Sequence, residues 1–319
     1  MTTRAARAGD APTVGPATVG PVRPVPPRIP GDPAEVPGAS IGSALRSAAT
    51  GARLGWAIES NWSDPLLFTI YSVARPVAAA LIVVAMVVVV TGAREPSVIA
   101  YFIVGTALWN FVGGGIVGLV FSVLDDRERY RMLKYVFLSP ASLLPVLLGR
   151  ASARILISAF GAAITLLVGI VLLGVRIDPT GIGWPLLAVS SALGFVAIGA
   201  IGVAMGGLCL QLRQEAWSYP EAVSGALYLV SGAVFPIDVL PPALQAIALC
   251  TPLTWWLEGS RRALLGVATP TILAAYSDTA VVAALAVTSV AWAAAGLATY
   301  SFFVRRARDR GLIDQLTSS

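Results

Sequence analysis

The stretch YPEAVSGALYLVSGAVFPIDVLPPALQAIALCTPLTWWLEGSRRALLG, residues 219–266, decides the fold because it joins a long apolar segment to one too short to cross a bilayer. Ala222 to Phe235 is apolar or small, which is the composition of most of a transmembrane helix. Pro236 is expected to end that helix, since proline has no backbone N–H and restricts the residue before it. The next apolar run, Ala243 to Leu249, covers only about 10 Å at about 1.5 Å per residue.

Prolines surround this short run. Pro241 and Pro242 precede it, and Pro252 follows it, just before the pair Trp255 and Trp256. Tryptophan is enriched at the boundary between membrane and water. A chain that starts back into the bilayer and then stops predicts a re-entrant or interfacial helical hairpin on one side of the membrane, closing over the apolar segment that precedes it.

The composition of the whole chain indicates a polytopic membrane protein. Of its 319 residues, 56% are hydrophobic and only 12% are charged, whereas about 25% are charged in an ordinary soluble domain. Histidine is absent, and the single lysine, Lys134, does not follow the glycine pattern of a Walker A loop. We therefore expect no catalytic site, metal or cofactor in this chain. The net charge of +5 comes from short clusters between apolar segments, a pattern that does not indicate nucleic-acid binding.

Two motifs together resemble one family. Residues 231–236, SGAVFP, and residues 240–266, LPPALQAIALCTPLTWWLEGSRRALLG, resemble the last third of type-2 ABC exporter permeases, and above all the daunorubicin-resistance type of drug-efflux subunit. Residues 125–150, DDRERYRMLKYVFLSPASLLPVLLGR, are similar to that family's cytoplasmic loop. The resemblance covers roughly residues 61–310. It implies an all-α permease that lacks an ATPase site, with ATP and Mg bound by a separate cytoplasmic ABC ATPase subunit.

The chain is expected to divide into four parts. Residues 1–40 are rich in Pro and Gly and have no apolar run, which predicts a disordered cytoplasmic tail. Residues 41–64 predict an amphipathic interfacial helix, with a loosely membrane-apposed linker as the alternative. Residues 65–310 form the predicted permease domain, and residues 311–319 form a cytoplasmic C-terminal tail. The six predicted spans cover about 66–91, 97–123, 143–175 and 184–210, a fifth that ends at Phe235, and about 278–304.

Six spans place both termini on the same side of the membrane. Because the tail, the loop that begins at Asp125 and the cluster from Arg305 to Arg310 hold most of the cations, that side is predicted to be the cytoplasm. We expect a multi-pass protein of a bacterial plasma membrane, with Cys209 and Cys250 on opposite faces.

Two arginines then lie on the outer side, against the usual charge distribution. Arg261 and Arg262 follow Glu258 at helical spacing, so the carboxylate can pair with either of them. Arg150 and Arg154, near the cytoplasmic start of the third span, are expected to extend toward lipid phosphates.

Residues 124–139 are the most charged stretch and predict a water-exposed helix. Its helical pattern places Tyr130, Leu133 and Phe137 on one side, which could dock into a partner's groove. The alternative is an ordinary positively charged loop. The resemblance favours docking on the ATPase subunit, and the candidate coupling residues are Asp126, Arg127, Glu128, Arg129, Tyr130 and Arg131.

Candidate pathway and gate residues come from the other spans and the hairpin. Arg75 lies inside the first span, where a charge costs a few kcal/mol and requires snorkelling, a partner or a polar cavity. Glu221 begins the fifth span, where the helix dipole favours a carboxylate, and a gating or substrate role is the alternative. The full set of candidates is Arg75, Glu221, Tyr228, Phe235, Pro236, Pro241 and Trp255.

The resemblance implies two permease copies, or one copy with a paralogue, facing each other across a pathway lined by the first, second and fifth spans. Few ionisable residues lie at mid-depth, which favours an apolar or amphipathic cargo such as a drug, an antibiotic or a lipid-like compound. A lipid-linked polysaccharide or another cell-envelope precursor is the alternative cargo. An ion-coupled secondary carrier usually needs acidic residues within spans, and an intramembrane enzyme needs a nucleophile and a base, so both classes fit the sequence less well.

Overall fold

The computed structural model describes residues 41–60, 65–91, 96–133, 135, 143–212, 217–266 and 271–310. Within these ranges every regular element is helical, which confirms the all-α part of the predicted fold class. The chain divides into residues 1–38 and residues 39–319, and all the described helices belong to the second unit. The predicted tails at 1–40 and 311–319 lie outside the described residues.

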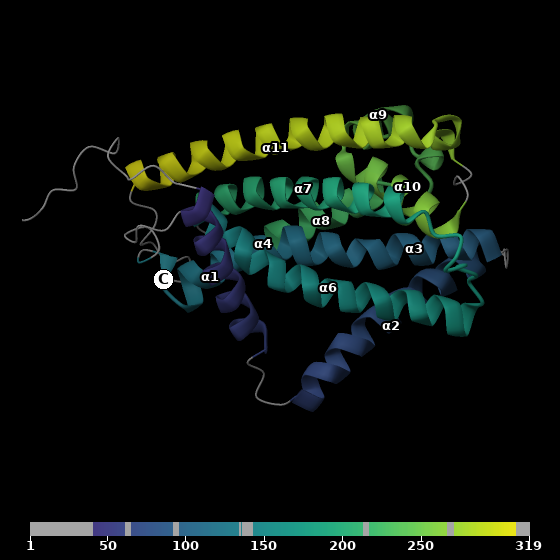
Figure 1. The fold of residues 1–319 in the computed structure, drawn as a ribbon, viewed down its shortest axis with the longest axis horizontal. Helices are drawn as coiled ribbons and strands as arrows, with labels where there is room; N and C mark the ends of the chain where they lie inside the picture. The colour runs from purple at the N-terminus through teal and green to yellow at the C-terminus, as the bar shows by residue number, and fades with distance from the viewer. Residues whose placement is uncertain are drawn as a thin grey trace, which may run out of the picture. The chain divides into compact units, whose positions relative to one another are not determined.

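Among the described residues, four helical runs are long and apolar enough to cross a membrane. The first combines α3 (Pro96–Val112), the π-helical segment η2 (Gly113–Val117), α4 (Gly118–Leu124) and a second π-helical segment, η3 (Asp125–Arg129). The others are α6 (Leu143–Leu173), α7 (Trp184–Cys209) and α11 (Asp278–Asp309), and the four runs lie side by side in Figure 1. They correspond to the second, third, fourth and sixth predicted spans.

The first and fifth predicted spans are not confirmed. Helix α2 (Pro65–Thr91) offers a shorter apolar stretch, Val73–Ile82, among its described side chains. Helix α8 (Ser218–Val230) has 13 residues, which at about 1.5 Å per residue cover about 20 Å of a hydrocarbon core about 30 Å thick. The count of six spans therefore stays a prediction.

Helix α8 ends earlier than the sequence predicts. Its last residue is Val230, whereas Pro236 was expected to end it. Gly232 has a φ of +77°, a left-handed conformation that glycine adopts without steric cost, and this residue turns the chain before the proline is reached. The short segment η4 (Ile237–Val239) follows the turn.

Two short helices form the hairpin region. Helix α9 (Pro242–Cys250) and helix α10 (Pro252–Leu265) each begin at a proline, a favoured first residue of a helix, and Thr251 between them is extended. The segment η5 (Ile272–Ala275) then leads into α11. The helices form as the proline pattern indicates, while their re-entrant position in a bilayer stays a prediction.

The largest hydrophobic core lies where α3, η2, α4, α7 and α10 meet. Trp256 of α10 is 1% exposed and packs among side chains of the other helices. Trp255 is also buried, so the tryptophan pair packs inside the protein, and its position at the membrane–water boundary stays a prediction. Core members from each helix include Val104, Ile116, Val120, Ile198, Ile201 and Leu253.

Helix α1 (Ile41–Ser60) packs against the start of α6 at the end of the bundle that also holds η3 (Figure 1). The two backbones approach so closely that a Cβ atom on Gly149 would overlap the carbonyl oxygen of Ala48, and one on Gly51 would overlap that of Val146. Small residues permit such contact between helices. Its position in the lipid headgroup layer stays a prediction.

Candidate functional site

The end of the bundle at η3 holds a buried ion pair. Arg150 of α6 pairs with Asp126 of η3, and the two side chains are 2% and 5% exposed. The guanidinium also donates to the backbone oxygen of Ser122, with a separation of 3.2 Å. The prediction that Arg150 extends toward lipid phosphates is therefore wrong, because its charge is neutralised inside the protein.

Arg127 is also buried, with 4% of its surface exposed. Its Nη1 atom donates to the backbone oxygens of Cys209 at 3.0 Å and Leu212 at 3.3 Å, and its Nε atom bonds Glu128 at 2.7 Å. Cys209 is the last residue of α7 and Leu212 lies just beyond it, so the arginine caps the C-terminus of that helix, where the dipole favours a cation. The first part of the charged stretch is thus packed into the bundle, contrary to the prediction of a water-exposed helix.

Arg154 links α1 to this end of the bundle. Its Nε atom lies 2.7 Å from Glu59 of α1, and its Nη2 atom lies 3.6 Å from Asp125 of η3. The side chain is 22% exposed, so it bridges two carboxylates at the margin of the protein rather than extending alone toward lipid. One residue of α6 therefore holds both α1 and η3.

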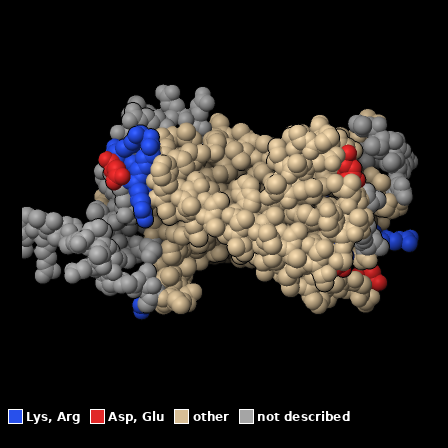
Figure 2. Space-filling model, turned by 90° about the horizontal axis from the view of Figure 1, so that it is seen from above, with Lys and Arg blue, Asp and Glu red and all other residues tan. Residues whose placement is uncertain are grey.

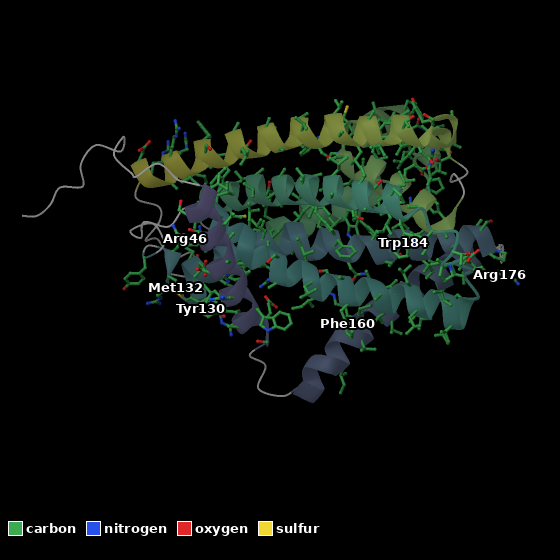
Figure 3. The ribbon with its side chains drawn as sticks, in the orientation of Figure 1. Arg46, Tyr130, Met132, Phe160, Arg176 and Trp184 are labelled. Atoms are coloured by element: carbon green, nitrogen blue, oxygen red, sulfur yellow. The ribbon has the colours of Figure 1, made fainter. Side chains whose placement is uncertain are left out.

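The charged helix does not continue as predicted. Arg131 has a φ of +52°, which ends the helical run, and Leu133 then returns to the core with 1% exposure. Arg129, Arg131 and Tyr135 are exposed, and Tyr130 is half-buried. Figure 3 shows Tyr130 and Met132 at the same end as Arg46 of α1. Phe137 lies outside the described residues, and the docking role of this stretch stays a prediction.

At the opposite end, Arg261 of α10 is buried and joins three elements. Its Nη2 atom donates to the carbonyl oxygens of Gly232 at 2.9 Å and Ala233 at 2.8 Å. Its guanidinium lies 3.7 Å from the ring centroid of Tyr101 on α3, and the Tyr101 hydroxyl donates to Gly232 at 2.9 Å. A cation over an aromatic ring is attractive, and more so when both are shielded from water.

The next residue, Arg262, holds the following loop. It pairs with Glu258 at 2.7 Å, which confirms the pairing that the helical spacing predicts. It also donates to the backbone oxygens of Leu273 and Tyr276, each at 2.7 Å, and lies 3.0 Å from Asp278 at the start of α11. Consecutive arginines on α10 thus fix the segment before it and the segment after it.

The predicted gate residues lie in several places. The segment η4 is flanked by Phe235, Pro236 and Pro241, close in sequence to the carbonyls that Arg261 bonds. Glu221 is instead exposed in the first turn of α8, and Arg75 is exposed on α2. These side chains do not form one site, and their roles stay predictions.

Aromatic pairs connect α3 and α4 with the segment around α8. Trp109 lies 4.9 Å from Tyr228 between ring centroids, Phe121 lies 5.6 Å from Trp217, and Phe102 lies 6.4 Å from Phe235. The predicted gate residue Trp255 instead packs edge-on against Tyr276 at 5.5 Å. An aromatic surface of this kind can contact apolar or planar molecules as well as protein.

The sequence did not identify Tyr101 or Arg261 as candidates, nor Arg150 as a buried residue. A signal for Arg261 was present, because three charges at Glu258, Arg261 and Arg262 interrupt an otherwise apolar segment. No comparable local signal marks Tyr101. Among the described residues, no group of three or more His, Cys, Asp or Glu side chains could hold a metal ion.

The charges and the four apolar runs define a class of protein. On the face shown in Figure 2, Lys, Arg, Asp and Glu lie at the two ends, and a broad surface between them has none. Such an uncharged band is what a bilayer core requires. The chain is thus a multi-pass helical membrane protein.

Comparison with known families identifies this class more closely. Residues 54–265 match the ABC-2 type transporter family, whose members are membrane permease components of ABC transporters. Because the match covers more than half of the chain, the chain belongs to this family. A comparison with curated proteins finds no match.

Proposed function

We propose that the chain is the permease subunit of an ATP-driven exporter of the daunorubicin-resistance type and moves an apolar or amphipathic compound out of a bacterial cell. The observation that carries this proposal is the family match over residues 54–265. In this proposal a separate cytoplasmic ABC ATPase binds ATP and Mg, and a second permease copy or a paralogue completes the pathway.

The η3 end supports contact with an ATPase. Exposed Arg129 and Arg131 follow the buried residues Asp126 and Arg127 closely in the chain. Asp126 contacts Arg150 of α6, and Arg127 contacts the end of α7. In this proposal, a movement of the exposed segment shifts both helices. Arg154 adds α1 to the same assembly. ATP can shift the permease between two conformations only if the ATPase binds them with different affinity, and the η3 end is where we place that difference.

The proposed topology has six spans, with both termini in the cytoplasm and the α9–α10 hairpin on the outer side. Exposed cations at the C-terminal end of α11 support this orientation, namely Arg305, Arg306 and Arg310. Helix α8 and the turn at Gly232 together form the fifth span, and α9 and α10 close over it as the external gate.

The cargo is proposed from the surface between α3 and α8. Tyr228 and Trp109 contribute aromatic surface there. A Cβ atom added to Gly113 or Gly225 would meet no other atom within 4 Å, so both glycines border open space. An aromatic surface with small residues suits an apolar or amphipathic compound. A lipid-linked polysaccharide remains the alternative cargo, because sugars also stack on aromatic rings.

An ion-coupled carrier is the alternative of another class. It would need acidic residues at mid-depth, and the acids of the four apolar runs are Asp125, Asp126 and Glu128 at the η3 end and Asp278 and Asp309 at the two ends of α11. Their positions at helix ends favour the ABC exporter.

Photolabelling with an azido derivative of ATP tests whether ATP binds to a separate subunit. The tagged chain is purified from native membranes under mild detergent conditions, and the label is located by mass spectrometry. We expect the label on a co-purifying subunit that has a Walker A loop. Purification without such a subunit would contradict the proposal and favour the ion-coupled carrier.

A further inference from the structure

Beneath Arg261 lies a small polar cavity that the proposed function does not use. Its volume is about 10 Å³, and it is lined by residues from α3, the turn after α8, η4, α10 and the loop at η5. The lining residues are Tyr101, Ser231, Gly232, Ile237, Thr254, Glu258, Arg261, Thr271 and Leu273. Six of these nine residues carry a polar side chain, which distinguishes the cavity from an apolar packing defect.

Two buried polar atoms at this cavity have no hydrogen-bonding partner in the protein. These atoms are the Oγ atom of Ser231 and the Nε atom of Arg261. The other nitrogen used by Arg261, Nη2, is saturated by the carbonyls of Gly232 and Ala233. Buried donors and acceptors are almost always paired, so two orphaned atoms on the wall of one cavity indicate that a further partner binds there.

The partner must be very small and must both donate and accept. A volume of about 10 Å³ is at the lower limit for one water molecule, which typically makes about three hydrogen bonds to buried polar groups. An anion or an organic ligand does not fit this volume. Water can accept from the N–H of Arg261, donate to Ser231 and donate again to the carboxylate of Glu258, whose oxygens accept more than one hydrogen bond each.

We propose that this cavity binds one structural water molecule. The water bridges Arg261 and Ser231 and completes the hydrogen-bonded contact between α10, the turn after α8, and α3. The water gives Nε of the guanidinium an acceptor while Nη2 bonds the turn and the ring of Tyr101 lies against the guanidinium face. Arg261 is therefore a positioning residue for the α9–α10 hairpin. This inference does not depend on transport, so it can fail or stand separately from the proposed function.

Radiolytic hydroxyl-radical footprinting tests the site, because radicals formed from a bound water oxidise side chains that bulk solvent does not reach. The full-length chain is embedded in nanodiscs, and oxidation of Tyr101 is compared with that of Tyr300. The two tyrosines are matched controls, since they are 6% and 8% exposed, and Tyr300 does not line the cavity. We expect Tyr101 to be oxidised at least fivefold faster. Equal rates would overturn the proposal.

Substitution of Ser231 by valine separates a bound water from ordinary access to solvent. The Ser231→Val side chain fills part of the cavity and removes one partner of the water, so oxidation of Tyr101 should fall to about the rate of Tyr300. Ser224→Val changes another buried serine of the same region, one that does not line the cavity, and should leave oxidation of Tyr101 unchanged. Fast oxidation of Tyr101 that survives in Ser231→Val would also overturn the proposal.

Discussion

Arg150 of α6 forms an ion pair with Asp126 of η3 while both side chains are almost fully buried. These residues are 24 positions apart, counted as 150 minus 126, and come from different helices. The pair joins the charged segment that we expect to face the ATPase to the start of an apolar helical run. We therefore expect a movement of η3 to shift α6 directly through this contact.

Replacement of Arg150 by methionine should destabilise the folded chain strongly. Asp126 would remain buried without its cation, and breaking a buried pair in this way costs about 3–5 kcal/mol. Denaturant titration of the purified chain in detergent measures the change. The double variant Asp126→Leu with Arg150→Met removes both charges and should recover most of the loss. If the double variant were as unstable as the single one, the ion pair would not be the cause.

The partly exposed Arg154 provides the matched control. Its contacts with Glu59 and Asp125 lie at the protein margin, with the arginine side chain 22% exposed. Such pairs contribute about 0–1 kcal/mol. Arg154→Met should therefore change stability far less than Arg150→Met in the same titration.

Replacement of Gly149 by alanine should weaken the attachment of α1. The added Cβ atom would overlap the backbone oxygen of Ala48, so α1 must shift. Overpacking of this kind costs about 1–3 kcal/mol, which exceeds the helix propensity that alanine adds. Thermal unfolding in detergent checks the result. Gly199→Ala is the control, because its Cβ would meet only Leu148 at 3.9 Å. An equal effect at the two positions would contradict the close contact between α1 and α6.

Substitution of the exposed arginines in residues 124–139 should affect ATPase activity, whereas substitution of the buried Arg127 should affect stability. The double substitution Arg129→Glu and Arg131→Glu alters exposed charges and should reduce the cargo-stimulated ATPase activity of the complex several-fold, with little change in the melting temperature. Arg127→Met should instead lower stability by about 1.5–3 kcal/mol, because the bonds from its charged guanidinium to Cys209 and Leu212 are lost. If cargo-stimulated ATPase activity were unchanged in the double variant, the proposal that the ATPase docks on these residues would be wrong.

The natural cysteines can test the proposed topology. Cys250 on α9 is exposed, and Cys209 on α7 is buried. An impermeant maleimide applied to intact cells should label Cys250, and Cys250→Ser should abolish the signal. In the Cys250→Ser background, Arg310→Cys should be labelled only after the cells are permeabilised. Labelling of both positions from the same side would refute the six-span arrangement with an outer hairpin.

The helical class and four of the spans could be predicted because long apolar segments are a local property of the sequence. The end of α8 could not, since Gly232 resembles the other small residues around it, whereas Pro236 is the stronger stop signal. The burial of Arg150 depends on Asp126 reaching it from another helix, and sequence spacing gives no measure of that contact. The pair of Glu258 and Arg262 was predictable because the two residues lie one helical turn apart.

The central claim is that this chain is driven by a separate ATPase. The most direct measurement is ATP hydrolysis by the complex co-purified from native membranes and reconstituted in liposomes, with and without a panel of amphipathic compounds. The account predicts hydrolysis by the partner subunit that rises with at least one compound and falls in the variant with Arg129→Glu and Arg131→Glu. A chain that purifies without an ATPase, or hydrolysis unaffected by both the compounds and the substitutions, would contradict it.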